Sequence, residues 1–467
     1  MTLNRLAAGR LAAGLASVLL AGCAAQHYVP APLAADAAAS AFSARSLADP
    51  GLRSFEERCL GGSIEAWPTP TWDLKTLSLA AWYFNPQLDE ARASLSESQA
   101  ALKTAGARPN PTLSASPGVP SPYLLTLDLS FPLETAGKRG LRIEGARNLE
   151  LASRLELAET AWKIRSAVRE ALLDYLVSVQ SLDRLRSEAE IRETQVKILQ
   201  QMFSAGESRR LEVDAARSEL SRAHSALRAA EEASAEQTAK LAAAIGVPAG
   251  ALRGAHLVWP DLAAPPRAES FPLAEIQRDA VLNRLDVRDS LARYAAAEAA
   301  LQLEIAKQYP DVDLGPGYTY EERRSYFTVG LSAAIPLFDR NQGPIAEAEA
   351  RRRQASAQFV ETQSQAISRS ERALAIYRVA LEGLTEAGQL ASLEERRLEA
   401  TRQSVRAGEQ DSLDLADAEI QYSIAAGARL DAVAHAQRAL GELEEAVERP
   451  LAPGDELPAV KDLDAPR

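Results

Sequence analysis

The chain has 467 residues, of which 25% are charged and only 5% aromatic, and its formal net charge is -12. An acidic chain without a basic tract argues against nucleic acid as a partner. Its length allows two or three ordinary domains. The low aromatic content, together with abundant Ala, Leu, Glu and Arg, favours long helices over a thick mixed core.

The first 22 residues have the pattern of a lipoprotein signal peptide. Two Arg residues precede a short apolar run at residues 11–20, which is too short to span a bilayer as a helix. The sequence LAGC, which ends at Cys23, resembles a bacterial lipobox and so implies cleavage before Cys23 and a covalent lipid on its sulfur. Ala24, rather than Asp, follows it, which in enterobacterial-type sorting points to the outer membrane. The alternative is a plain secretory signal in which this Cys has no role.

The remaining reactive residues predict neither an enzyme nor a bound cofactor or metal. Cys59 is the other Cys, so lipidation of Cys23 would leave no disulfide within the chain. No HExxH motif and no Gly-rich phosphate loop is present. The four His residues lack the spacing of metal ligands; they are His27, His224, His256 and His435.

An internal duplication with a shift of about 200 residues organises the chain. Between the two copies lies a segment rich in Pro, Ala and Gly. We predict an extended segment over 23–72, a first repeat over 73–246, a linker over 247–271, a second repeat over 272–448 and a tail over 449–467. The matching pairs are Asn85-Pro86-Gln87-Leu88-Asp89 with Asn283-Arg284-Leu285-Asp286, Pro111-Thr112-Leu113 with Pro310-Asp311-Val312, Phe131-Pro132-Leu133 with Ile335-Pro336-Leu337, and Ser204-Ala205-Gly206-Glu207 with Arg406-Ala407-Gly408-Glu409.

Each repeat is predicted to contain the same elements in the same order. A helical stretch opens it, at 73–107 and at 272–308, with a break at Asn85 or Asn283, where Asn favours a cap and Pro86 a first helical turn. Two strands follow. A long helix comes next, at 141–204 and at 344–406, and a Gly turn leads into a returning helix that ends near Ile245 or Val447.

Strict alternation of apolar and polar residues identifies the strands. Residues 123–131 place Tyr123 and four further apolar side chains on one face, and Thr126, Asp128 and Ser130 on the other. Residues 327–335 alternate in the same way, from Phe327 to Ile335. A weaker candidate strand precedes each of them, around 112–116 and 311–318.

Four strands are too few to close a barrel, since a membrane barrel needs at least eight. A trimer would supply twelve strands, with apolar faces toward lipid, polar faces toward a lumen, and long helices for a closed tube. The fold class predicted is therefore mostly α with a small β part, in which a trimeric 12-stranded outer-membrane β-barrel continues into a long α-helical barrel. The alternative is a set of amphipathic strands on a soluble core, although the sequence offers no other apolar layer to cover them. The predicted lipid-facing residues are Leu125, Leu127, Leu129, Val329 and Leu331.

With these features the chain resembles the outer-membrane efflux proteins of the TolC type over nearly the whole mature chain. The resemblance implies a homotrimeric duct in the outer membrane that extends into the periplasm. Its partners would be a periplasmic adaptor and an inner-membrane pump of the resistance-nodulation-division class, which supplies the energy. The stretches LETAGKRGLR and IPLFDRNQGPIAEAEARR are most similar to the heavy-metal branch, the CzcC/CusC-like lipoproteins, so metal cations are the expected substrate.

Two alternatives remain open at this point. Within the family, the chain would be a duct for drugs or for type I protein secretion. In another class, it would be a lipid-anchored periplasmic coiled-coil scaffold without a pore, which would have no need of the repeated strands.

The resemblance also implies two sets of working residues. The helix turns would form the tips that contact the adaptor, although their glycines are equally explained as helix caps; the tip residues are Ala205, Gly206, Glu207, Ala407, Gly408 and Glu409. Polar side chains near the tips would close the duct at rest, and rings of carboxylates select cations. The alternative is an ordinary solvated helix face. The gate candidates are Glu395, Glu399, Gln403, Asp411 and Asp414.

Overall fold

The computed structural model describes residues 27–118 and 124–452. The chain divides into a short unit that ends at Ala44 and a main unit that begins at Arg45. In the short unit, the described residues form α2 (Ala35–Ser43). The predicted signal peptide, Cys23 and most of the predicted tail lie outside the described residues. Within the described part of the chain, no helix is both long and apolar enough to cross a membrane.

The main unit contains the same run of elements twice, and the prediction of a mostly helical fold with a small β part is confirmed. The linker contains two 3-10 helices, η1 (Ala249–Leu252) and η2 (Ala268–Ser270). The first run is α4 (Leu74–Phe84), α5 (Pro86–Ala105), β1 (Thr112–Gly118), β2 (Leu124–Leu133), α6 (Lys138–Ala205) and α7 (Arg210–Ile245). The second run is α8 (Leu273–Leu282), α9 (Leu285–Ala306), β3 (Val312–Glu321), β4 (Arg324–Ala333), α10 (Gln342–Ala407) and α11 (Ser412–Val447).

The sequence predicts an extended segment before the first repeat, but the structure has a helix there, α3 (Pro50–Leu60). The Asp49 side chain caps this helix by accepting hydrogen bonds from the N–H groups of Gly51 and Leu52, and Pro50 occupies the first turn. Leu52 and Phe55, three residues apart, are buried. The prediction was wrong because the helix is short and its burial depends on partners outside it.

The breaks in the opening helices lie where the sequence predicted them. Asn85 ends α4 and caps α5, accepting a hydrogen bond of 2.9 Å from the N–H of Gln87. In the second repeat α8 ends at Leu282, but Asn283 caps nothing with its side chain and Arg284 stands at the cap position of α9. The break is therefore common to both repeats, whereas its capping chemistry is not.

The strands form one antiparallel sheet in the order β1-β2-β3-β4, so β1 and β4 are its edges. The sequence predicted that the last strand would reach Ile335, but β4 ends at Ala333. Ala333 lies opposite Val312, the first residue of β3, and beyond this pair β4 meets no partner strand among the described residues. Tyr123, the predicted first residue of the second strand, lies outside the described residues.

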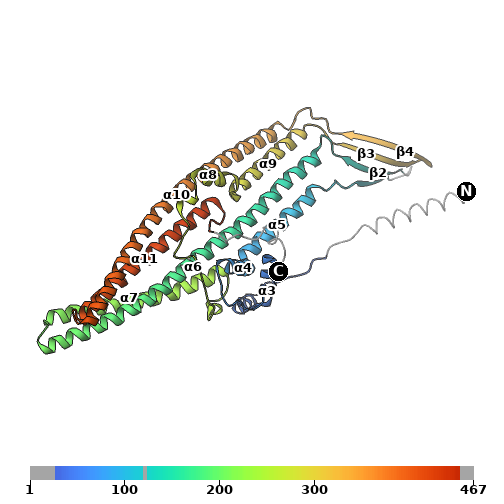
Figure 1. The fold of residues 1–467 in the computed structure, drawn as a ribbon. Coiled ribbons are helices and arrows are strands. Elements are labelled where there is room, and N and C mark those ends of the chain that lie inside the picture. Colours follow the sequence, from blue (N-terminus) through green and yellow to red (C-terminus); the bar gives the residue numbers. More distant parts are fainter. Residues whose placement is uncertain (1–26, 119–123, 453–467) are drawn as a thin grey trace. The chain divides into compact units, whose positions relative to one another are not determined.

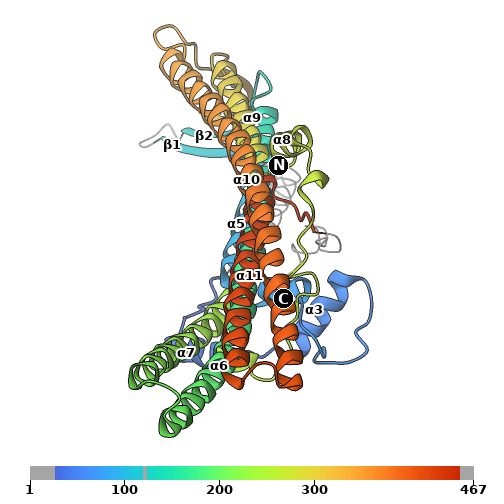
Figure 2. The same ribbon diagram turned by 60° about the vertical axis from the view of Figure 1, so that its left-hand side comes forward.

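The short helices pack along the long ones. α5 and α7 both contact α6, α11 contacts α10 and α6, and α9 contacts α6 and α10. Figures 1 and 2 show the strands at one end of the long helices and the α6–α7 and α10–α11 turns at the other. The expectation that opening and returning helices lie one after the other along a long helix is confirmed.

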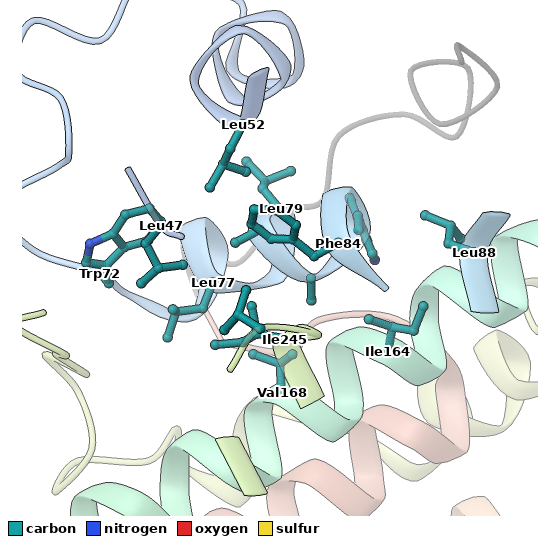
Figure 3. Close-up of a cluster of buried hydrophobic side chains, with 14 of the residues drawn as sticks. Leu47, Leu52, Trp72, Leu77, Leu79, Phe84, Leu88, Ile164, Val168 and Ile245 are labelled. Carbon is teal, nitrogen blue, oxygen red and sulfur yellow. The ribbon is translucent and has the colours of Figure 1, made fainter. Parts of the chain in front are cut away.

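A large apolar core lies midway along α6, where α3, α4 and the end of α7 meet it (Figure 3). Leu52, Leu79 and Val168 are among its fully buried residues. The indole N–H of Trp82 donates a hydrogen bond of 2.8 Å to the carbonyl of Ala161, which satisfies its one polar group. This core anchors the N-terminal helices of the main unit to the first long helix.

A buried ionic cluster joins the two repeats. Arg165 and Arg169 of α6 lie 3.2 Å and 3.3 Å from one carboxylate oxygen of Glu444 on α11. The other carboxylate oxygen accepts a hydrogen bond of 2.9 Å from the N–H of Leu451. Arg169 also donates to the carbonyl of Gln437 and lies over the ring of Trp259. Because the three charged side chains are almost fully buried, each depends on the others for its solvation.

A second buried carboxyl has no such compensation. Glu56 of α3 is completely buried, and neither carboxylate oxygen has a hydrogen-bond partner among the described residues. Burial, and to a smaller extent the charge of Asp73, raises the pKa of Glu56 to about 8. At neutral pH this side chain is therefore largely protonated.

Candidate functional site

One face of the sheet is apolar along all four strands. In the observed register Leu113 lies opposite Leu129, Leu127 opposite Tyr318, and Tyr318 opposite Phe327. Opposite residues share a face, so the alternation found in β2 and β4 continues across the whole sheet. The other face carries Ser114, Thr126, Asp128, Thr319 and Thr328.

All five residues predicted to face lipid lie on the apolar face. Val329 and Leu331 of β4 are 79% and 74% exposed, whereas Leu127 and Leu129 are half-buried by neighbouring strands. Every residue of β4 is exposed, so none of the elements in residues 27–118 and 124–452 covers it. Exposed apolar faces of this kind are typical of surfaces that contact another protein or a membrane.

The sequence did not identify the tyrosines of β3 as part of this face. Tyr318 and Tyr320 belong to it, and the ring of Tyr318 lies 5.3 Å from that of Phe327. They gather near the β3–β4 turn, and aromatic residues at strand ends are typical of the lipid–water boundary. In the sequence, their place on this face was indicated only by the alternation of apolar and polar residues over 311–318, which Gly and Pro interrupt.

At the exit of β2, polar contacts connect the first repeat to the second. The N–H of Thr135 donates a hydrogen bond of 2.9 Å to Asp311, and Lys138 forms an ion pair of 2.7 Å with the same carboxylate. Burial alone would raise the pKa of Asp311, but these contacts outweigh it and lower the pKa. A side chain at the start of each long helix also donates a hydrogen bond to the end of the helix that precedes the strands. Arg139 donates to the carbonyl of Gly106, and Asn341 donates to the carbonyl of Glu304.

The two helix turns have nearly identical geometry. Gly206 has φ +80° and Gly408 φ +76°, in the left-handed region that favours glycine. The N–H of Glu207 donates to Met202 and that of Glu409 to Ser404, as in a Schellman motif. Apart from the residues adjacent in sequence, no atom of the described part of the chain lies within 4 Å of where a Cβ would stand on either glycine. Lack of space is therefore not the reason for glycine at these positions. The six predicted tip residues are all exposed.

The gate candidates divide into two groups. Glu395, Glu399 and Gln403 are exposed on α10, and the Gln403 amide donates to Glu399 at 3.3 Å. Asp411 and Asp414 instead form the capping box of α11, in which Asp411 accepts from the N–H groups of Leu413 and Asp414. Both carboxylates thus accept backbone hydrogen bonds at the N-terminus of α11.

Glu395 and Glu399 line a groove of about 900 Å³ between α6, α10 and α11. Glu190 of α6 and Glu419 of α11 line it as well, and Glu419 pairs with Arg402 at 3.2 Å. The sequence missed these two carboxylates because they come from other helices. Nearby, burial and the charges of Asp414 and Asp411 raise the pKa of Asp417.

Within residues 27–118 and 124–452, no group of three or more His, Cys, Asp or Glu side chains is placed to hold a metal ion. Arg184, Arg396 and Arg402 line the same groove, so its carboxylates are largely balanced by guanidinium groups.

Comparison with known sequences identifies the family. The profile of the outer membrane efflux protein family matches residues 81–247 and 277–447, which includes most of both repeats. The chain belongs to the outer membrane efflux protein family. The resemblance to TolC-type proteins drawn from the duplicated strand-to-helix units is confirmed.

A curated relative is the cobalt-zinc-cadmium resistance protein CzcC of Cupriavidus metallidurans, 27% identical over 280 residues. The match covers 57% of this chain and 63% of the relative, which is less than two thirds of its length. CzcC falls in the branch that the two junction sequences indicated.

Three solved structures share the fold. A membrane protein from Pseudomonas aeruginosa superposes with a TM-score of 0.66 at 19% identity, covering 80% of this chain and 90% of the other. CusC superposes with a TM-score of 0.65 at 19% identity, covering 82% and 94%. VceC from Vibrio cholerae superposes with a TM-score of 0.65 at 20% identity, covering 81% and 97%.

Proposed function

We propose that this member of the outer membrane efflux protein family is the outer-membrane exit duct of a tripartite efflux system and acts as a homotrimer. The main support for this proposal is the four-stranded sheet. Its apolar face is exposed, no strand of the described residues pairs with its two outer edges, and it continues directly into helices of 68 and 66 residues. Three copies would close twelve strands into a barrel and align the long helices as a tube beneath it.

The first test is the state of the protein in membranes. Detergent-solubilised, unheated protein should run as a trimer rich in helix with some strand. A monomer that stays soluble once Cys23 is replaced by Ala would contradict the duct and favour the periplasmic scaffold.

Heavy-metal cations are the proposed substrate, which is supported by the similarity to CzcC. Deleting the gene should sensitise cells to particular divalent metals, and the wild-type gene should restore tolerance. Unchanged metal tolerance with altered drug tolerance, or with loss of a secreted protein, would favour the multidrug or type I secretion alternative.

The exposed turns are the proposed contact for a periplasmic adaptor, which would link the duct to an inner-membrane pump of the resistance-nodulation-division class. Gly206→Asp and Gly408→Asp should uncouple efflux while leaving trimers intact, because both turns are exposed. Normal efflux in both variants would contradict the proposal that these turns contact the adaptor.

We further propose that Cys23 carries a lipid and that the duct needs no cofactor or catalytic site. Metabolic labelling with palmitate should label the wild-type protein and not Cys23→Ala. Labelling that persists in the variant would place the lipid elsewhere.

A further inference from the structure

In each repeat, the end of the returning helix meets the break in the opening helix. The shift of 202 residues between the two helix turns also relates Gly246, which follows α7, to Glu448, which follows α11. In the first repeat, Arg45 donates hydrogen bonds of 2.9 Å and 2.7 Å to the carbonyls of Phe84 and Gly246. Carbonyl groups do not titrate, so these two acceptors keep the same charge at every pH.

The second repeat builds the junction with an ionisable group. Arg284, at the break between α8 and α9, donates hydrogen bonds of 2.9 Å to the carbonyls of Glu445 and Ala446 near the end of α11. The carboxylate of Glu448 accepts a hydrogen bond from the N–H of Leu285 and lies 3.3 Å from the Arg284 guanidinium. Because the side chain of Glu448 is only 4% exposed, the end of α11 is held through a buried carboxyl group.

The backbone at Glu448 has a conformation that favours glycine. Its φ is +50°, and Gly246 at the equivalent position has φ +88°. A Cβ on Gly246 would lie 3.2 Å from the carbonyl of Phe84, which leaves little room for a side chain there. Left-handed backbone is disfavoured for a residue with a Cβ, so the junction of the second repeat depends on side-chain contacts that offset this strain.

Arg284 does not fully balance the charge of Glu448. Its guanidinium forms two hydrogen bonds with Asp286, at 2.9 Å and 2.7 Å, and is farther from Glu448, at 3.3 Å. One cation is therefore shared by two carboxylates. Burial raises the pKa of Glu448 to about 7, although the charge of Arg284 and the N–H of Leu285 oppose this change.

The other charged groups at this junction have partners of their own or add negative charge. On α6, Lys163 pairs with Glu159, whose charge raises the pKa of Glu448 further. Next to Glu448, Arg449 pairs with Asp279 at 2.6 Å. The charged groups around the junction are Arg284 and Asp286 at the start of α9, Lys163 and Glu159 on α6, Asp279 on α8, and Glu445 and Arg449 at the end of α11.

We propose that the end of α11 is a proton-controlled hinge, which Glu448 holds against the break between α8 and α9 when protonated and releases when ionised. A protonated carboxyl keeps an oxygen that accepts from the N–H of Leu285, and it has no charge to bury. The ionised group is solvated better by water than by the shared Arg284.

The hinge has a consequence for the far end of the same helix. A helix released at one end can change its tilt, and the other end of α11 begins at the turn that contains Gly408. This consequence rests on the duct proposed above, in which the position of that turn would depend on pH. The hinge itself lies within one chain and does not rest on the duct.

Opening of the junction should become easier as the pH rises. In the closed junction the pKa of Glu448 is about 7, and in the open one its ordinary value of 4.5 applies. The closed state therefore holds the proton more tightly, is most favoured below pH 4.5, and loses stability as the pH rises to about 7. The equilibrium constant for opening should increase on the order of a hundredfold between pH 4.5 and 8.

Amide hydrogen exchange of the full-length protein in detergent tests the hinge, measured by mass spectrometry on peptides that cover residues 440–450. After correction for the intrinsic pH dependence of exchange, the wild type should exchange faster at pH 8 than at pH 4.5. Glu448→Gln keeps an acceptor oxygen but cannot ionise, so it should lose this pH dependence. Glu448→Gly removes both the carboxyl and the strain, and should lose it as well. Glu442→Gln, at an exposed position of α11, is the matched control and should retain it.

The variants are compared with the wild type at each pH, so the titration of Glu56, which all of them share, cancels. Corrected exchange that stays constant in the wild type between pH 4.5 and 8 would overturn the hinge. A pH dependence that persists in both Glu448→Gln and Glu448→Gly would overturn it too. Because exchange reports on each chain, this result is independent of trimer formation, which tests the duct separately.

Discussion

The two long helices have nearly the same length and the same place in their repeats, yet they have different surroundings. α6 contacts α5, α7, α9 and α11 and buries Trp162, Arg165 and Leu172. α10 contacts fewer elements and leaves Val360, Val379 and Leu390 exposed. The contrast is reversed in the returning helices, since α11 of the second repeat is more deeply buried than α7 of the first. Burial therefore follows which helices pack together, since α11 contacts both long helices, and not simply which repeat a helix belongs to.

The largest effect expected from this comparison is at the buried ionic cluster that α6 forms with α11, which has no counterpart among the described residues of α10. Replacing Glu444 with Ala leaves Arg165 and Arg169 buried without their carboxylate, and should cost about 3–5 kcal/mol of unfolding free energy. Thermal unfolding of the purified protein measures it. Glu442→Ala, on the exposed side of α11, is the matched control and should change stability by less than about 0.5 kcal/mol. Equal losses in both variants would mean that the cluster does not hold the repeats together.

The core beside α6 should also respond to pH. The folded pKa of Glu56, about 8, lies above its unfolded value of 4.5, so the folded state holds the proton more tightly. Stability therefore falls as pH rises from about 4.5 to 8. Glu56→Gln removes this dependence, and at pH 8 it should be more stable than the wild type by about 2–4 kcal/mol, with little difference at pH 4.5. Denaturant unfolding at both values checks it; the same gain at both would exclude titration of Glu56 as the cause.

The helix turns should behave alike in the two repeats, unlike the long helices. Gly206→Ala and Gly408→Ala should each cost about 1–2 kcal/mol, because alanine is disfavoured at positive φ even where space is free. Gly383→Ala, within α10 and also free of neighbours, should instead gain about 0.5–1 kcal/mol. Unequal losses at the two turns would show that their surroundings differ in the assembled protein.

The smallest effect concerns the covered strand exit. Lys138→Met should cost about 1 kcal/mol, because Asp311 is partly exposed and water screens the pair. The pKa of Asp311 should rise in the variant, so part of the loss should disappear at low pH. Lys103→Met on α5 is the control and should leave stability unchanged. A full loss that persists at pH 3 would point to the hydrogen bond of 2.7 Å from Lys138 to the carbonyl of Tyr309 rather than to the pairing with Asp311.

Much of the architecture was predictable because it depends on short-range patterns. Alternation identified β2 and most of β4, and the Gly turns and Asn85 marked helix ends to within a few residues. Helix α3 was missed because eleven residues carry too little periodicity, and the weaker strand β3 did not reveal that Tyr318 and Tyr320 share the apolar face. The groove carboxylates Glu190 and Glu419 could not be linked to Glu395, since each lies on a different helix.

The sequence by itself determined the duplication, the order of elements and the apolar face of each main strand, because these follow from local propensity and from periods of 2 and 3.6 residues. Only the tertiary structure decided which repeat-related contacts are made within one chain. Asp311 covers the exit of β2 while Phe338 stays exposed at the exit of β4. The reason is geometric: an open sheet of four strands has two edges, and a single chain cannot bring them together.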